Sequence, residues 1–387
     1  MIDMYLRSTR GTFLYREDRI TELLACIAKY YGIDITIVVI YSNKSKNEMV
    51  KIGNTNYVIW DLSYWQNYER YLSLLMEFEA CENNKDNINT QIQLCAVLYR
   101  ILSKNFINIS ELISAKLYAY SLQYQYESIN HNDHSEIRKQ VNISKAFVFI
   151  HELMHEVFSM REWYVKSQRE HINTIIELIL SNKSDELLNV IYSNSAKDIL
   201  ILKEGIISVL KQEDSNFMEE TLADISAFDE CIMFIRDIHK PSFEKLIEEI
   251  PYIRNSVRHI KYFNATIAQG VTLINEMIYF TNNETTTKGI DSYFERVNAY
   301  NAKVIVREHF FVVREHLFWH VYLAQKGYSS SLNTINYCEI KPRQTIVDKH
   351  VTPIWNDMVN VGLFQAILDT PEHEGLIREW KKRFSKY

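Results

Sequence analysis

Glycine and proline are scarce in this sequence, with 9 Gly and 5 Pro among 387 residues. Both residue types interrupt regular structure, so a long chain with so few of them favours long helices over a turn-rich all-β fold. Apolar residues make up 47% of the chain, an ordinary share for a globular protein. A chain of this length can bury a large core, and we expect two or three packed units.

Paired cysteines and long uncharged apolar segments are also missing. An odd, dispersed set of cysteines without a CxxC pair indicates reduced thiols in a cytosolic protein. The set is Cys26, Cys81, Cys95, Cys231 and Cys338. The first residues contain no apolar core of a signal peptide, and the most apolar long stretch, 304–323, is interrupted by four charged side chains. We therefore expect a cytoplasmic protein without a membrane segment.

Motifs and charge that would favour nucleotides or nucleic acids are absent. The sequence has no GxxxxGK[ST] and no GxGxxG motif, so neither nucleotide hydrolysis nor dinucleotide binding is indicated. The net charge of -6 gives no support to non-specific binding of nucleic acid. The remaining motifs point to other chemistry.

The N-terminal part alternates helical and extended patterns. The expected elements are a helix at 17–31, a strand at 35–41, a second extended stretch at 51–60 and a helix from about 62 to 80. Gly32 is placed to end the first helix, and Asp61 or Ser63 could cap the last one. The Gly53-Asn54 pair predicts a turn, which leaves residues 57–60 as the firm part of the second strand.

Most of the sequence after residue 80 has helical patterns, so the predicted fold is mainly α with a small N-terminal β-sheet, an α+β class. We expect an α/β part at 1–92, a helical core at 93–240 and a helical C-terminal region at 241–387. Polar stretches predict loops at 82–91, 125–138, 282–289 and 327–336. The strand at 57–60 is a candidate edge strand for an extended peptide; the alternative is an ordinary core strand.

The most informative motif is HExxH, formed by His151, Glu152 and His155 after an apolar run that includes Phe147 and Phe149. Residues i and i+4 share one face of a helix, so both histidines can reach one metal ion. Glu152 is placed to take a proton from a water at that metal. Two imidazoles leave a zinc site incomplete, so a third ligand is needed.

A second helical segment around residues 216–227 offers the third ligand. Asn216 can cap this helix, and Glu219 is then at the reciprocal capping-box position, which gives it a structural role. Glu220 and Asp224 share a face with two alanines that would allow close approach of another helix. Glu220 could coordinate the metal, and Asp224 could accept the N–H of a ligating histidine.

These residues resemble a known superfamily. His151-Glu152-x-x-His155 followed by Glu220-x-x-Ala223-Asp224 is similar to the HExxH and ExxAD motifs of the gluzincin metallopeptidases. The resemblance covers residues 147–227. It implies a zincin-like core and one Zn²⁺ per chain, held by His151, His155 and Glu220. It further implies that Glu152 is the general base, that Asp224 supports a zinc histidine and that the substrate is a protein or peptide.

Hydrolysis would also need a donor to the developing oxyanion, usually Tyr or His. The sequence does not rank the available side chains. They include Tyr164, His171, Tyr192, His239, Tyr262 and Tyr279.

A competing motif, RNxxxH, is formed by Arg254, Asn255 and His259 at the start of a probable helix. It is similar to the motif of HEPN ribonucleases, which are usually all-helical dimers whose arginine and histidine face a scissile phosphate. The alternative is an ordinary amphipathic helix. The overall negative charge does not favour an RNA surface, although Arg258 and Lys261 could form a local basic patch.

Two further features carry weaker signals. His316 and His320 form an HxxxH pair that lacks the glutamate, among bulky aromatic residues, which is typical of a core helix. Residues 378–387 form a basic amphipathic tail, interpreted as a solvated helix end. A non-enzymatic interaction protein with a structural metal site is the last alternative, and the oligomeric state is not determined by the sequence.

Overall fold

The computed structural model describes residues 12–13, 19–42, 47–80, 84–106, 134–181, 215–239 and 252–261, together with single residues and pairs between 115 and 271. The chain divides into two compact units. The first comprises residues 1–150, 231–289 and 350–387, and the second comprises residues 151–230 and 290–349. The predicted loops at 282–289 and 327–336, the HxxxH pair and the basic tail lie outside the described residues.

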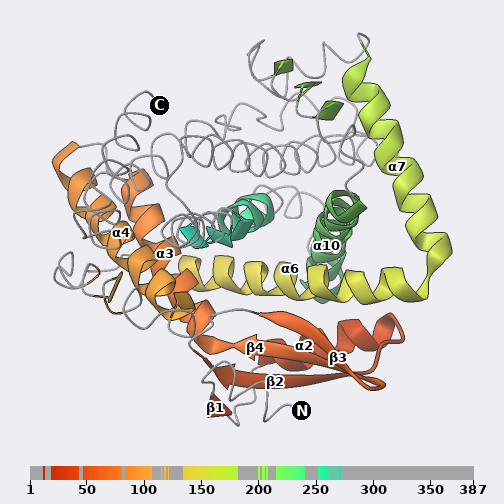
Figure 1. Ribbon diagram of the computed structural model, residues 1–387, viewed down its shortest axis with the longest axis horizontal. Helices are drawn as coiled ribbons and strands as arrows, with labels where there is room; N and C mark the ends of the chain where they lie inside the picture. The colour runs from red at the N-terminus through yellow and green to blue at the C-terminus, as the bar shows by residue number, and fades with distance from the viewer. Residues whose placement is uncertain are drawn as a thin grey trace, which may run out of the picture. The chain divides into compact units, whose positions relative to one another are not determined.

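The first unit contains a small mixed sheet with the strand order β1-β2-β4-β3 (Figure 1). The strands are β1 (Thr12–Phe13), β2 (Ile35–Tyr41), β3 (Glu48–Ile52) and β4 (Thr55–Asp61). β2 and β4 are parallel, whereas β3 pairs antiparallel with β4 through the turn at Gly53. Val38, Ile40 and Ile59 form a buried cluster on this sheet. These strands confirm the predicted strand at 35–41 and the predicted turn.

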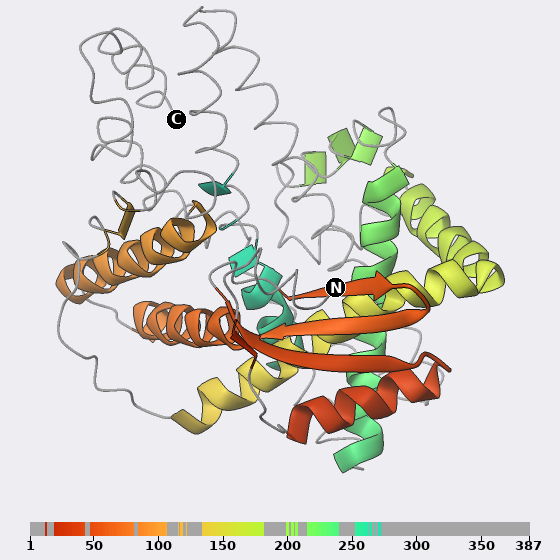
Figure 2. The same ribbon diagram turned by 60° about the horizontal axis from the view of Figure 1, so that its bottom comes forward.

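The prediction that residues 57–60 form an edge strand is wrong. β4 pairs with β2 on one side and with β3 on the other, so it is an interior strand (Figure 2). The sequence of β4 explains this position, because Val58, Ile59 and Trp60 are all buried and a continuous apolar run is typical of a strand covered on both faces. The alternative interpretation, a core strand, is confirmed.

Helix α2 (Arg19–Tyr30) packs against β2 and ends as predicted at Gly32. Gly32 has a φ of 72°, a conformation that glycine adopts readily. Its N–H donates to the carbonyl of Lys29, and the N–H of Ile33 donates to the carbonyl of Ala28. These two bonds form a Schellman motif, which satisfies carbonyls that the helix end would otherwise leave open.

Helix α3 (Leu62–Ala80) follows β4 directly and is capped by Asp61, one of the two predicted caps. Oδ1 of Asp61 accepts hydrogen bonds from the backbone N–H of Ser63 at 2.9 Å and of Ser42 at 3.2 Å. Asp61 is fully buried, so its carboxylate fixes both the start of α3 and the end of β2.

Helix α4 (Asn84–Phe106) packs against α3 (Figures 1 and 2). It includes most of the predicted loop at 82–91 and also residue 92, where a boundary was expected, so that loop prediction is wrong. Residues 84–91 are polar but contain neither Gly nor Pro, so their composition does not interrupt a helix.

Helix α6 (His134–Met160) is one continuous helix that carries the HExxH motif. It begins before residue 138, so the predicted loop at 125–138 is too long at its C-terminal end. Helices α7 (Glu162–Leu180) and α10 (Ser215–His239) follow α6 in the chain, and α10 belongs to the second unit as far as residue 230. The described part of the chain is therefore mostly helical with a small sheet, as the α+β prediction states. No helix among the described residues combines the length and apolar character needed to cross a membrane.

Within the first unit, a buried chain of hydroxyl groups holds the N-terminal half of α6. The Ser144 hydroxyl donates to the carbonyl of Ser256 at 3.0 Å. Tyr68 from α3 lies 2.9 Å from the same Ser144 oxygen, so its O–H is the donor in that bond. Burial raises the pKa of Tyr68, which keeps the hydroxyl protonated as a donor.

We predict that Ser144→Ala destabilises the protein more than Tyr68→Phe does. Without Ser144 the buried hydroxyl of Tyr68 loses its acceptor, which costs about 1–3 kcal/mol. Tyr68→Phe removes a donor but leaves the Ser144 bond to Ser256 intact, so we expect a loss of about 1 kcal/mol. The measurement is the free energy of unfolding in urea. Ser159→Ala, an exposed site on the same helix, is the control, and equal losses at residues 68 and 144 would contradict the prediction.

Candidate metal centre

The apolar residues around HExxH fix the direction in which the two histidines point. Phe149 and Ile150 before the motif and Leu153 and Met154 inside it are buried, at 2% exposure or less. Because these side chains take the core side of α6, His151 and His155 are left one turn apart on a face that remains partly accessible, at 14% and 25% exposure. The uncharged pair between the histidines is therefore required by packing.

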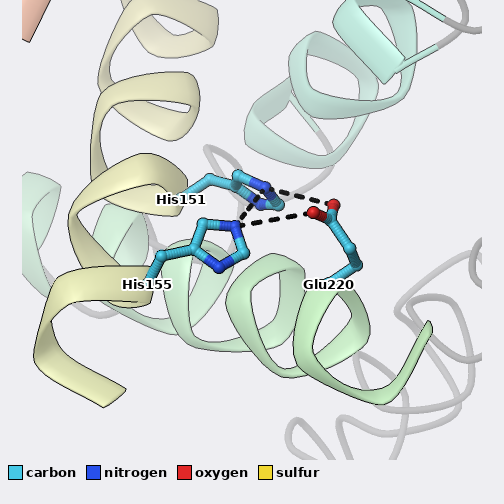
Figure 3. A group of neighbouring side chains, drawn as sticks. All are labelled: His151, His155 and Glu220. Carbon is cyan, nitrogen blue, oxygen red and sulfur yellow. Dashed lines mark hydrogen bonds and ion pairs between the residues drawn. The ribbon is translucent and has the colours of Figure 1, made fainter. Parts of the chain in front are cut away.

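Helix α10 brings the third predicted ligand to the same place. Ala223 and Ala227 are fully buried, and their small side chains allow a neighbouring helix to come close. Glu220 lies on the same face, one turn before Asp224, and its carboxylate reaches both histidines. Figure 3 shows the two imidazole rings and the carboxylate of Glu220 pointing toward one another.

The three side chains are spaced as ligands of one ion would be. Nε2 of His151 lies 3.6 Å from one carboxylate oxygen of Glu220, and Nε2 of His155 lies 3.7 Å from the other. The two Nε2 atoms are 3.4 Å apart. A tetrahedral zinc site with bonds of about 2.0–2.1 Å has ligand atoms about 3.3–3.4 Å apart. These separations are long for hydrogen bonds and suit atoms that share a cation, so the residues fit a metal ion.

The outer nitrogen of each imidazole faces a carboxylate of α10. Nδ1 of His151 lies 3.1 Å from Oδ1 of Asp224, which is almost fully buried. This is the contact that the sequence predicts for Asp224. Nδ1 of His155 lies 3.0 Å from Oε1 of Glu219. A carboxylate at Nδ1 keeps the proton there and leaves Nε2 with a lone pair for a metal.

The capping-box prediction for Asn216 and Glu219 is wrong. α10 already begins at Ser215, so Asn216 lies in its first turn, and the carboxylate of Glu219 contacts His155. The Glu219 side chain contacts α6 and does not cap its own helix. The number of orienting groups could have pointed to this role of Glu219. Two ligating histidines require two such groups, and Asp224 can serve only one of them.

The electrostatics of the site are dominated by negative charge. Burial alone would lower the pKa of His151, but the carboxylates of Asp224 and Glu220, with a further contribution from Glu152, raise the pKa of His151 to about 9. The metal-free imidazole therefore holds a proton at neutral pH that a bound cation would replace. Glu152 itself is half-buried beside His151 on α6.

Of the candidate oxyanion donors, Tyr164 is the one whose side chain the structure describes. Its ring stacks on Phe158, one turn after His155, with ring centroids 6.0 Å apart. Its hydroxyl lies 3.4 Å from Oγ of Ser226. Tyr164 thus packs beside the helices of the site, but its hydroxyl is directed to α10 at Ser226. The side chains of the other five candidates lie outside the described residues.

The competing RNxxxH residues are buried in the first unit. Arg254 and His259 are 6% and 8% exposed. Nδ1 of His259 lies 3.2 Å from Oε1 of Gln140 on α6. Residues 252–261 are helical, with Ile253, Val257 and Ile260 fully buried. This geometry favours the interpretation as a packed amphipathic helix over a site that receives a phosphate.

In comparisons with protein-family models, with curated proteins and with solved structures, the chain matches none. The resemblance to gluzincins therefore rests on the residues of α6 and α10 described above.

Proposed function

We propose that this chain is a zinc-dependent metallopeptidase that hydrolyses peptide bonds of a protein or peptide substrate. The observation that supports the proposal best is the convergence of His151, His155 and Glu220 from two helices, with all their ligand atoms within 4.8 Å of one another. A His₂Glu donor set that leaves one tetrahedral position open is characteristic of catalytic zinc.

The partial exposure of the ligands supports a catalytic role over a structural one. His155 and Glu220 are 25% and 30% exposed, so a substrate can approach them. Structural zinc sites are closed by four protein ligands, and among the residues that the structure describes this group has three. Glu152 would have no function at a purely structural ion.

Each residue has a role that follows from its place. The two imidazoles and the Glu220 carboxylate would hold the ion, and Asp224 would fix the ring of His151. Zinc bound at such a site acts as a Lewis acid toward a carbonyl and lowers the pKa of water. Glu152 would accept the proton of the attacking water and deliver it to the leaving amine.

We expect about one zinc per chain in protein purified without added metal, and loss of that zinc in His155→Ala. The substitution removes one of three ligands. Elemental analysis measures the content directly. Glu170→Gln, an exposed glutamate on α7, should keep the metal. A wild-type protein that contains no zinc and takes up none when it is added would contradict the proposed site.

Glu152→Gln should keep its zinc and lose peptide hydrolysis by a factor of about 10²–10⁴, the contribution typical of a general base. Glutamine has nearly the same shape but cannot accept the proton. Cleavage of an unstructured protein and of a peptide library, followed by mass spectrometry, provides the measurement. Hydrolysis at the wild-type rate would exclude Glu152 as the base. Cleavage of RNA that persists in EDTA and is lost in His259→Ala would instead favour the ribonuclease alternative.

A further inference from the structure

Glu219 makes a contact that the proposed function does not use. Its Oε1 lies 3.0 Å from Nδ1 of His155, within hydrogen-bond distance. The opposite ring nitrogen of His155, Nε2, faces His151 and Glu220. The ring is therefore held between two consecutive residues of α10, with one carboxylate at each nitrogen.

Each histidine has a carboxylate of α10 near its Nδ1. Asp224 lies at Nδ1 of His151 and Glu219 lies at Nδ1 of His155, at 3.1 and 3.0 Å. They differ in burial, since the side chain of Asp224 is 4% exposed and that of Glu219 is 50% exposed. One helix thus contributes three carboxylates, of which one would bind the metal and two would orient its histidines.

We propose that Glu219 is a positioning residue for His155, an inference that rests on the proposed zinc site. By accepting a hydrogen bond from Nδ1–H it favours the tautomer whose Nε2 lone pair faces the ion, and it fixes the rotation of the ring.

If Glu219 and His155 formed only an ordinary surface ion pair, the effect of removing Glu219 would be different. An exposed pair contributes little to stability, because solvent screens it and ordering two side chains is costly. If Glu219 were only such a pair, its removal would change neither folding nor metal binding. A positioning residue instead changes zinc affinity while the stability of the metal-free chain stays nearly the same.

The test compares the full chain with Glu219→Ala, Glu219→Gln and the control Glu170→Gln. The dissociation constant for zinc is measured by competition with a chromophoric chelator, and unfolding of the metal-free proteins is measured in urea. We expect Glu219→Ala to bind zinc about 10- to 100-fold more weakly. Glu219→Gln, which keeps an acceptor oxygen, should lose less, and Glu170→Gln should match the wild type. Unchanged zinc affinity in Glu219→Ala would overturn the proposal.

The tautomer provides a second measurement that needs no metal. Long-range ¹H–¹⁵N spectra of the metal-free protein, at a pH where the ring is neutral, report which nitrogen of His155 carries the proton. His155→Ala identifies the signals. We expect the Nδ1–H form in the wild type and a shift toward the Nε2–H form in Glu219→Ala. The same tautomer in both proteins would contradict the proposed role.

The outcomes separate this inference from the proposed function. Zinc binding that is insensitive to Glu219 removes only the positioning role. Zinc binding that depends on Glu219, in a protein that hydrolyses no peptide, retains the positioning role and refutes the peptidase. A wild-type chain that binds no zinc refutes both, whatever the tautomer shows.

Discussion

Pairing between carboxylates of α10 and imidazoles of α6 is the interaction on which the candidate site depends. An imidazole can present its lone pair to a metal only when its other nitrogen keeps the proton and the ring is held in one orientation. The carboxylates of Asp224 and Glu219 lie 3.1 and 3.0 Å from Nδ1 of His151 and His155, where they could meet these conditions. Glu220, on the same helix, lies where both Nε2 atoms point. The geometry of the centre is therefore set by how one helix lies against the other.

The carboxylates of the same site repel one another when no cation is bound. His151, Glu152, Glu220 and Asp224 lie together, and the carboxylates raise the pKa of His151 to about 9. A proton on His151 offsets part of this charge in the metal-free protein, and a divalent cation would offset more of it. Binding of a cation should consequently stabilise the folded arrangement of α6 and α10.

The part of the site that follows from helical periodicity could be predicted from the sequence. The i, i+4 spacing places His151 and His155 on one face, and the same spacing places Glu220 and Asp224 on one face of the second helix. Ala223 and Ala227 predict that this face of the second helix packs against another element, and both residues are fully buried. The sequence predicts a capping box for Glu219, because Asn216 is the only partner that a local pattern indicates for it. Its actual partner, His155, is 64 residues away in the chain, and no local pattern encodes such a distance.

The sequence by itself determined the type of most elements, because helix and strand periodicities are local properties. Gly32 and Asp61 also fixed where α2 ends and α3 begins, through backbone bonds within a few residues. Only the tertiary structure decided that β4 is an interior strand and that Arg254 and His259 are buried. The reason is the same in each case: strand pairing, packing and burial depend on neighbours that are distant in the chain.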